Sequence, residues 1–77
     1  MQVKLLLFGK LVDIIGNQSL TIENIPDTNG LVQYLHQCYP VLNTTNYMIA
    51  VDKKTIRDNT LLHEGTTIAL LPPFSGG

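Results

Sequence analysis

Side chains in residues 2–8 alternate between two faces, which predicts a β-strand. One face is apolar throughout, whereas the other changes from polar to apolar towards the end of the segment. The apolar face consists of Val3, Leu5 and Leu7, and the mixed face consists of Gln2, Lys4, Leu6 and Phe8. The pattern therefore predicts a strand that is buried on one side and that becomes apolar at the end of its other side.

A short helix and a second strand are predicted to follow. Apolar residues recur at helical spacing in residues 11–15, over about two turns. Gly16-Asn17 supplies a stop signal and a turn. Residues 20–25 alternate again and predict the second strand.

The main helix is predicted to begin at Asp27 or Thr28, because either side chain can cap the free amide groups of the first turn. It is predicted to end by Tyr39, because proline pushes the residue before it out of the helical region and Pro40 follows. An apolar stripe at three-to-four spacing is formed by Leu31, Leu35, Cys38 or Tyr39, and Leu42, with Val32 beside it. Cys38 is therefore expected to be a buried thiol.

Three short strands are predicted in the second half of the chain. Residues 48–51 and 55–56 are expected to form two strands joined by a turn at 52–54. Residues 66–71 alternate and predict the last strand. Its Ile68 and Leu70 face one side, and Thr67, Ala69 and Leu71 face the other.

This order of elements predicts a two-layer α+β domain. The sheet is expected to be mixed, with four or five strands, one main helix on one face and a short helix after the first strand. Leu61 and Leu62 are expected to fill the core from an irregular loop. A single helix covers only one face of a sheet, so Phe8 and Leu71 are expected on the open face. Apolar side chains gathered on such a surface indicate a protein contact.

Length, charge and cysteine content narrow the class of protein. At 77 residues the chain is expected to form one domain, residues 1–77, with 72–77 as a flexible C-terminal tail. The net charge is -1 and no basic stripe is present to neutralise phosphates, which argues against nucleic acid as a partner. No apolar stretch approaches the roughly 20 residues of a membrane helix. The lone Cys38 favours a reducing compartment, the cytoplasm.

The C-terminal segment carries the one reactive group that we identify in the sequence. Pro72-Pro73 fixes φ twice and removes two backbone donors, so it is expected to end the sheet and to send the tail out in an extended form. Phe74-Ser75 follows, and Phe74 is suited to anchor the base of the tail in an apolar groove. Gly76-Gly77 carries no Cβ and can thread a narrow channel. The terminal carboxylate of Gly77 is then the reactive handle.

Other chemistry-bearing residues give weaker signals. His36 and His63 have no sequence neighbours suited to metal binding, so no metal site is predicted and surface or structural roles are expected. Cys38 has no electropositive neighbour that would activate its thiol. No phosphate loop, paired catalytic carboxylates or nucleophile–base set is found. The chain is therefore not expected to be an enzyme on its own.

Four segments together carry a resemblance to a known family. They are VKLLLFG at 3–9, IAVD at 49–52, LHEG at 62–65 and IALLPPFSGG at 68–77. In these segments the chain resembles the small subunit of molybdopterin synthase, the MoaD family of sulfur carriers. The Pro-Pro pair four residues before the end, with Ser75 beside the glycines, is closer to this family than to other carriers that end in Gly-Gly.

The resemblance implies a ubiquitin-like β-grasp fold and a role in molybdenum cofactor biosynthesis. An ATP-using, MoeB-like activating enzyme would adenylate the carboxylate of Gly77, and sulfur transfer would convert it to a thiocarboxylate. The loaded tail would enter a MoaE-like large subunit, where its sulfur passes to a pterin precursor. The resemblance also implies a heterotetramer with two copies of each subunit, and no cofactor bound to this chain.

A docking patch is implied as well. Phe8 and Leu71 match positions that the family uses for apolar docking. Thr55 stands where the family often has a larger apolar residue, and Ile56 is expected to compensate. Three other functions stay open: a sulfur carrier for thiamine or another pathway, a ubiquitin-like modifier joined to target lysines through Gly77, and a plain binding module with a disordered tail.

We predict that Gly77→Ala, or deletion of Gly77, leaves folding intact and abolishes sulfur loading, because the altered end no longer fits the site that activates it. Mass spectrometry of the variant after incubation with the activating system measures the loading. A normal yield of thiocarboxylate on either variant would contradict the prediction.

Overall fold

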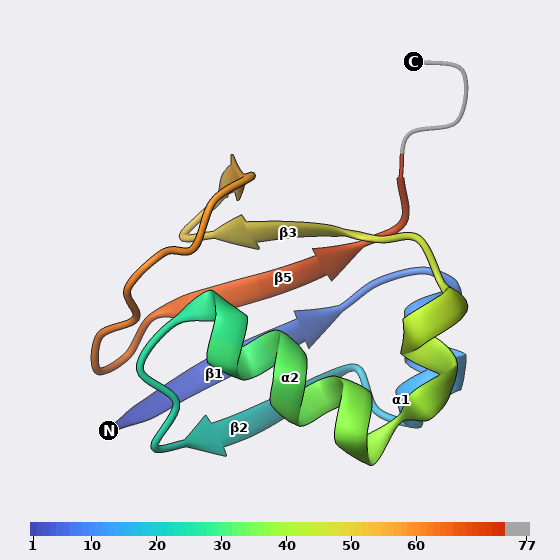
Figure 1. Ribbon diagram of the computed structural model, residues 1–77, viewed down its shortest axis with the longest axis horizontal. Helices are drawn as coiled ribbons and strands as arrows, with labels where there is room; N and C mark the ends of the chain where they lie inside the picture. Colours follow the sequence, from blue (N-terminus) through green and yellow to red (C-terminus); the bar gives the residue numbers. More distant parts are fainter. Residues whose placement is uncertain (74–77) are drawn as a thin grey trace.

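The first and last strands of the chain are neighbours at the centre of a five-stranded mixed sheet (Figure 1). The computed structural model describes residues 1–73. Its elements are β1 (Gln2–Leu7), α1 (Lys10–Ile15), β2 (Ser19–Glu23), α2 (Thr28–Cys38), the 3-10 helix η1 (Pro40–Thr44), β3 (Met48–Val51), β4 (Lys54–Ile56) and β5 (Thr67–Leu71). The strand order is β2-β1-β5-β3-β4. β1 and β5 are parallel, and the other neighbouring pairs are antiparallel.

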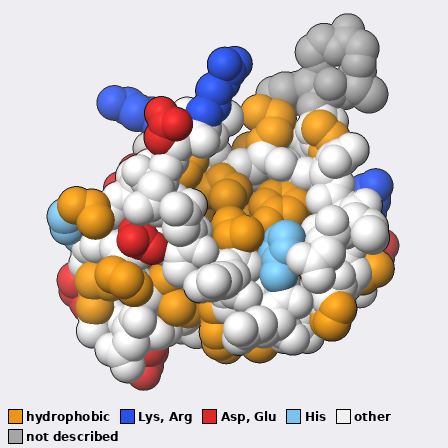
Figure 2. All heavy atoms as spheres, in the orientation of Figure 1, with side chains coloured by type: hydrophobic (Ala, Val, Ile, Leu, Met, Phe, Trp, Pro, Cys, Tyr) orange, Lys and Arg blue, Asp and Glu red, His pale blue; other side chains and the backbone are white. Residues whose placement is uncertain are grey.

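The helices lie on one face of the sheet. Figure 1 shows α2 crossing the sheet in front of β1 and β2, with α1 at one end. Seen from the same side, hydrophobic side chains reach the surface beside α2, over β3 and β5, and Lys and Arg side chains stand near the β3–β4 hairpin (Figure 2). The arrangement agrees with the predicted two-layer α+β domain.

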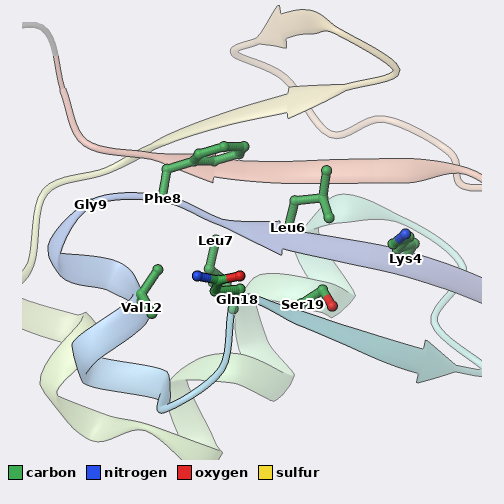
Figure 3. A pocket seen from close by; sticks show the side chains of 8 residues that line it. All are labelled: Lys4, Leu6, Leu7, Phe8, Gly9, Val12, Gln18 and Ser19. Atoms are coloured by element: carbon green, nitrogen blue, oxygen red, sulfur yellow. The ribbon is translucent and has the colours of Figure 1, made fainter.

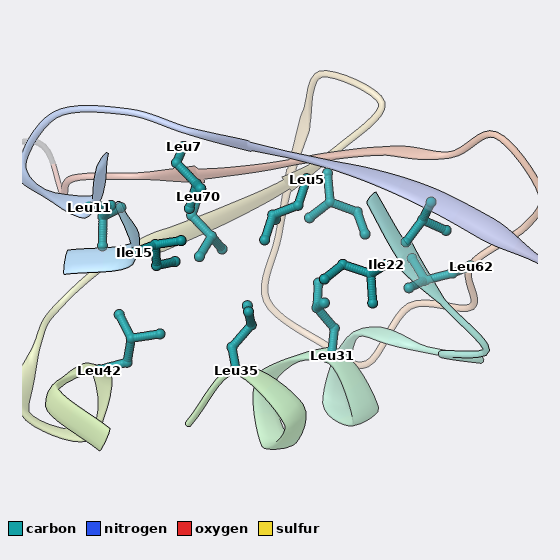
Figure 4. Close-up of a cluster of buried hydrophobic side chains, with 12 residues drawn as sticks. Leu5, Leu7, Leu11, Ile15, Ile22, Leu31, Leu35, Leu42, Leu62 and Leu70 are labelled. Carbon is teal, nitrogen blue, oxygen red and sulfur yellow. The ribbon is translucent and has the colours of Figure 1, made fainter. Parts of the chain in front are cut away.

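The hydrophobic core fills the space between the sheet and the helices (Figure 4). It is formed by alternate residues of the strands and by one side of each helix. Its buried members are Val3, Leu5, Leu7, Leu11, Ile15, Ile22, Leu31, Leu35, Leu42, Leu62, Ile68 and Leu70. The alternation predicted for residues 2–8 and for the last strand therefore assigned the core faces of both central strands correctly.

The ends of α2 follow from local chemistry. The Asp27 carboxylate accepts a hydrogen bond from the Gly30 amide at 2.8 Å, which caps the first turn as predicted. The last helical bond runs from the Tyr39 amide to the Leu35 carbonyl at 2.7 Å. Pro40 then begins η1, so the prediction that the helix ends by Tyr39 is confirmed.

Four sequence predictions about local structure are wrong, and the first three concern β2, Leu42 and Leu61. The second strand ends at Glu23, not at residue 25, because Asn24 has a φ of 62°, which a strand cannot contain. Leu42 fills the core from η1 and not from the main helix. Leu62 is buried as expected, whereas the side chain of Leu61 is 67% exposed.

Cys38 is exposed, which overturns the expectation of a buried thiol. The buried face of α2 carries Leu31 and Leu35, and Tyr39 packs against the core at the end of the helix. Successive helical residues are about 100° apart around the axis. Cys38 therefore lies to one side of the stripe, on the side of the exposed Tyr34.

A polar cluster around His36 holds the segment after α2 against the helix. His36 Nδ1 contacts Asn43 Oδ1, and its Nε2 lies 2.7 Å from the Tyr47 hydroxyl. An amide oxygen only accepts hydrogen bonds, so Nδ1 donates to Asn43, and Nε2 shares a second hydrogen bond with the Tyr47 hydroxyl. Burial raises the pKa of Tyr47. The structural role expected for His36 is thus the one its contacts support.

Replacing a core residue of β1 should lower the free energy of unfolding more than replacing its neighbour on the open face. Leu5 is fully buried, so Leu5→Ala is expected to lower the free energy of unfolding by about 3 kcal/mol. Leu6 lies on the other side of the strand and is only half-buried, so Leu6→Ala should cost less than about 1 kcal/mol. Urea unfolding followed by circular dichroism measures both. Equal losses would contradict the assignment of the two faces.

Stability should fall above pH 10 in a way that depends on Tyr47. The unfolded chain loses this phenolic proton near the ordinary value of 10.0, whereas the raised pKa keeps it in the folded state. The folded state then binds more protons, and the Tyr47 contribution is lost as the pH rises through the folded pKa. Tyr47→Phe should be less stable than the wild type by about 1 kcal/mol at pH 8, because it lacks the hydrogen bond to His36. Urea unfolding at pH 8 and pH 11 should show this difference shrinking, and a constant difference would refute it.

Candidate functional site

The face of the sheet opposite the helices carries an apolar groove. The strand register brings Leu6 of β1 beside Ala69 of β5, Ala69 beside Ala50 of β3, and Ala50 beside Thr55 of β4. The groove has a volume of about 500 Å³ and is lined by Leu6, Phe8, Ala50, Asp52, Lys53, Thr55, Thr67, Ala69 and Leu71. We call this surface the open-face groove.

The shape of the groove follows from residue size. The two alanines leave a low floor in the middle of the sheet, and Leu6, Phe8 and Leu71 stand beside it. The Phe8 side chain is 44% exposed although it is apolar. Large apolar groups beside a low floor form a surface that a partner can fill, because burying each such group is favourable.

A second hollow lies on the other side of Leu6 and Phe8 (Figure 3). It has a volume of about 490 Å³ and is lined by Lys4, Leu6, Leu7, Phe8, Gly9, Val12, Gln18 and Ser19. In Figure 3, Leu6 and Phe8 project from one side of β1 and Leu7 from the other. Leu6 and Phe8 therefore form a ridge that both hollows share. Lys4, Gln18 and Ser19 form the polar part of the lining of the second hollow.

Charged groups stand at the β3–β4 end of the open-face groove. Asp52 and Lys53 form the hairpin turn, with φ values of 48° and 75°. The Asp52 carboxylate accepts a hydrogen bond from the Thr67 amide at 3.0 Å, and the Asp52 amide donates to the Thr67 carbonyl at 2.8 Å. These bonds fix the turn to β5. Lys53 forms no ion pair within residues 1–73, so its charge is available at the edge of the groove.

The groove lies next to the place where the C-terminal segment leaves the sheet. β1 and β5 are parallel, so their carboxyl ends are at the same edge of the sheet. Phe8 follows β1, and Leu71 ends β5. Pro72 is half-buried and Pro73 is exposed. The base of the predicted tail is therefore at the apolar end of the groove.

The predicted site residues are only partly brought together. Phe8, Leu71 and Thr55 line one groove, whereas Ile56 does not. Ile56 pairs with Ile49, which packs against the core, so its side chain is on the helix side of the sheet and the expected compensation for Thr55 fails. Adjacent strand residues face opposite sides, so Thr55 and Ile56 cannot share a surface. The predicted residues Phe74, Ser75, Gly76 and Gly77 lie outside the described residues.

Sequence reasoning missed the floor of the groove. Ala69 shares a face with Leu71 by simple alternation, and this signal could have identified it. Ala50 could not be found in this way, because its place beside Ala69 depends on the pairing of β3 with β5.

In residues 1–73, no three His, Cys, Asp or Glu side chains are close enough to hold a metal ion. None of the helices in that part of the chain is long and apolar enough to cross a membrane.

Comparison with known proteins identifies a matching family and a curated relative. The model of the ThiS family matches residues 5–77. A curated relative, the molybdopterin synthase sulfur carrier subunit of Dictyostelium discoideum, is 34% identical, with 99% of this chain and 96% of the relative covered.

Two solved structures are similar over nearly the whole chain. One is a complex of subunits 1 and 2 of the molybdopterin-converting factor from Helicobacter pylori. The matching chain of that complex is 28% identical with a TM-score of 0.74, and the match covers 100% of this chain and 100% of that chain. The small archaeal modifier protein 1 of Methanosarcina acetivorans is 25% identical with a TM-score of 0.80, and 99% of this chain and 96% of that chain are covered. These likenesses confirm the expected ubiquitin-like β-grasp fold.

Proposed function

This chain belongs to the ThiS family, and on that basis we propose that it is the sulfur-carrying small subunit of a molybdopterin synthase. The observation that carries the proposal is the meeting of two features at one edge of the sheet. The apolar end of the open-face groove and the base of the Gly-Gly tail are adjacent there. A carrier that must dock on a partner and also deliver its C-terminus needs these two features side by side.

The proposed chemistry takes place at the carboxylate of Gly77. A carboxylate resists nucleophilic attack, so an ATP-using enzyme first joins it to AMP and releases pyrophosphate. A sulfur nucleophile then displaces AMP by acyl transfer and leaves a thiocarboxylate. In the synthase, this sulfur attacks the pterin precursor and forms a new C–S bond. Water then cleaves the bond between the sulfur and the Gly77 carbonyl carbon, which regenerates the Gly77 carboxylate. The chain supplies the acyl group and its delivery, and its partners supply the catalytic groups, so it is a subunit without catalytic activity of its own.

Ordering the C-terminal tail in a partner's site costs conformational entropy, and docking of the open-face groove on the same partner can offset this cost. Ordering the residues after Pro73 costs about 1–2 kcal/mol for each residue. Burying an exposed large apolar side chain contributes about 1.5–3 kcal/mol. Phe8 is 44% exposed and Leu6 and Leu71 are half-buried, so covering all three would offset the ordering of about two tail residues. We therefore propose that the open-face groove binds the large subunit, in a heterotetramer with two copies of each subunit.

A MoeB-like activating enzyme is the second partner in this proposal. ATP is its substrate, and this chain holds no cofactor of its own. The only cysteine of the chain is exposed and could form intermolecular disulfides in an oxidising compartment. We accordingly place the protein in the cytoplasm.

A ubiquitin-like modifier is the second candidate function, favoured by the likeness to the small archaeal modifier protein 1. The two functions use the same activated C-terminus and differ in its fate. A carrier accumulates as a free chain with the mass increase of one oxygen replaced by sulfur. A modifier accumulates as conjugates joined to lysines of other proteins.

The proposal is tested by incubating the protein with ATP, an activating enzyme of this class and a sulfide source. Mass spectrometry should show the adenylate and then the thiocarboxylate at Gly77. The loaded protein, mixed with a large synthase subunit and the pterin precursor, should lose its sulfur in a single turnover. Loading without any transfer, accompanied by lysine conjugates in cells, would reject the carrier function in favour of the modifier.

Two aromatic residues offer a matched test of the docking surface. Phe8 beside the open-face groove is 44% exposed, and Tyr34 on α2 is 42% exposed. Phe8→Ala should weaken binding to the large subunit by about tenfold or more, because it removes an apolar anchor. Tyr34→Ala should change the affinity by less than about twofold, because α2 lies on the opposite face. Isothermal titration calorimetry with the large subunit measures both, and equal losses would reject the groove as the interface.

A further inference from the structure

Gly9 occupies a position that requires glycine for two independent reasons. It joins β1 to α1 with a φ of 60° and a ψ of -140°, which side chains disfavour strongly. The parallel register pairs Leu7 with Leu70, so two residues further along both strands Gly9 comes to lie beside Pro72. This is where the C-terminal segment leaves the sheet.

The Pro72 ring occupies the space that a side chain on Gly9 would need. A Cβ built on Gly9 would lie 2.7 Å from Pro72 Cγ, 3.6 Å from Cδ and 3.9 Å from Cβ. Within residues 1–73, the other two glycines with positive φ are different, because a Cβ on Gly16 or Gly65 would meet no atom within 4 Å. Gly9 is therefore the glycine whose missing side chain makes room for the base of the tail.

The contact ties the tail to the docking surface. Phe8 stands beside the open-face groove, and its amide donates to the Leu70 carbonyl at 3.2 Å. Its neighbour Gly9 supports Pro72. We propose that Gly9 is a positioning residue that sets the direction in which the C-terminus leaves the body relative to the groove. This inference rests on the proposed function, since a direction matters only if the tail must reach a partner's site while the groove is docked.

The stiffness of the segment explains why the direction at its base matters. Pro72-Pro73 has two fixed φ angles and favours an extended form. The five residues after Pro72 span at most about 18 Å. A ring displaced by a methyl group on Gly9 turns the start of this segment, and misplacement of a reacting group by 1 Å can cost about a hundredfold in rate.

The test uses four variants of the full chain. Gly9→Ala introduces the close contact and the backbone strain together. Gly16→Ala is a control for a side chain at positive φ that meets nothing, although Gly16 is in the less strained αL region. Pro72→Ala removes the Cγ and Cδ atoms that a Gly9 side chain would meet and leaves only the Cβ at 3.9 Å. The double variant Gly9→Ala, Pro72→Ala therefore keeps the strain and relieves the contact.

Two measurements are made at a temperature where all variants are folded. In the wild type, nuclear Overhauser effects between the Gly9 α protons and the Pro72 ring protons should report the contact directly. In Gly9→Ala, the amide signals that follow Pro73 should shift, and the rate of sulfur loading should fall by about tenfold. Gly16→Ala should leave the amide signals after Pro73 in place and the loading rate within about twofold of the wild type. In the Pro72→Ala background, adding Gly9→Ala should lower the rate by no more than about threefold.

The outcomes separate this inference from the proposed function. If the wild type loads no sulfur, the proposed function fails. The Gly9–Pro72 Overhauser effects and the shifts of the amide signals after Pro73 still test the positioning role of Gly9. Absence of the Gly9–Pro72 effects would overturn the inference. It would also be overturned if Gly9→Ala lowered the rate equally in both Pro72 backgrounds, because backbone strain alone would then be the cause.

Discussion

The parallel pairing of β1 with β5 is the interaction on which the rest of this structure depends. It joins the first strand of the chain to the last and places Leu7 beside Leu70. Parallel strands have their carboxyl ends at one edge of the sheet, so Phe8, Leu71 and Pro72 are brought together there. An antiparallel pairing of the same two strands would put the groove and the base of the tail at opposite edges. The proposed function thus depends on strand direction as much as on residue type.

One face of β1 contributes to the stability of the fold, and the other contributes to the proposed docking surface. Leu5 and Leu7 fill the core, whereas Leu6 and Phe8 form the ridge between the two hollows of the open face. A register shift of one residue would exchange these sets and would destroy both properties at once. Apolar side chains on an uncovered sheet face favour aggregation. Their presence on the open face is therefore consistent with a surface that a partner covers.

Much of this arrangement could be predicted because it depends on local periodicity and on single residues with strong preferences. Alternation assigned the faces of β1 and β5, Asp27 predicted the start of α2, and Pro40 predicted its end. Some failures, those of Cys38 and Ile56, occurred where neighbours far apart in the sequence decide the outcome. Cys38 lies at the edge of the helical stripe, and the orientation of α2 on the sheet decides that this edge is left uncovered.

The sequence by itself determined the family and most of the strands and helices, because each is encoded in short stretches of residues. Only the tertiary structure decided what the open face looks like. Its floor depends on Ala50 and Ala69 being paired across two strands, and Ile56 was excluded from it by the register of β4. The contact of Gly9 with Pro72 joins residues more than sixty positions apart. Such a contact is fixed by strand pairing, which no local pattern in a single sequence encodes.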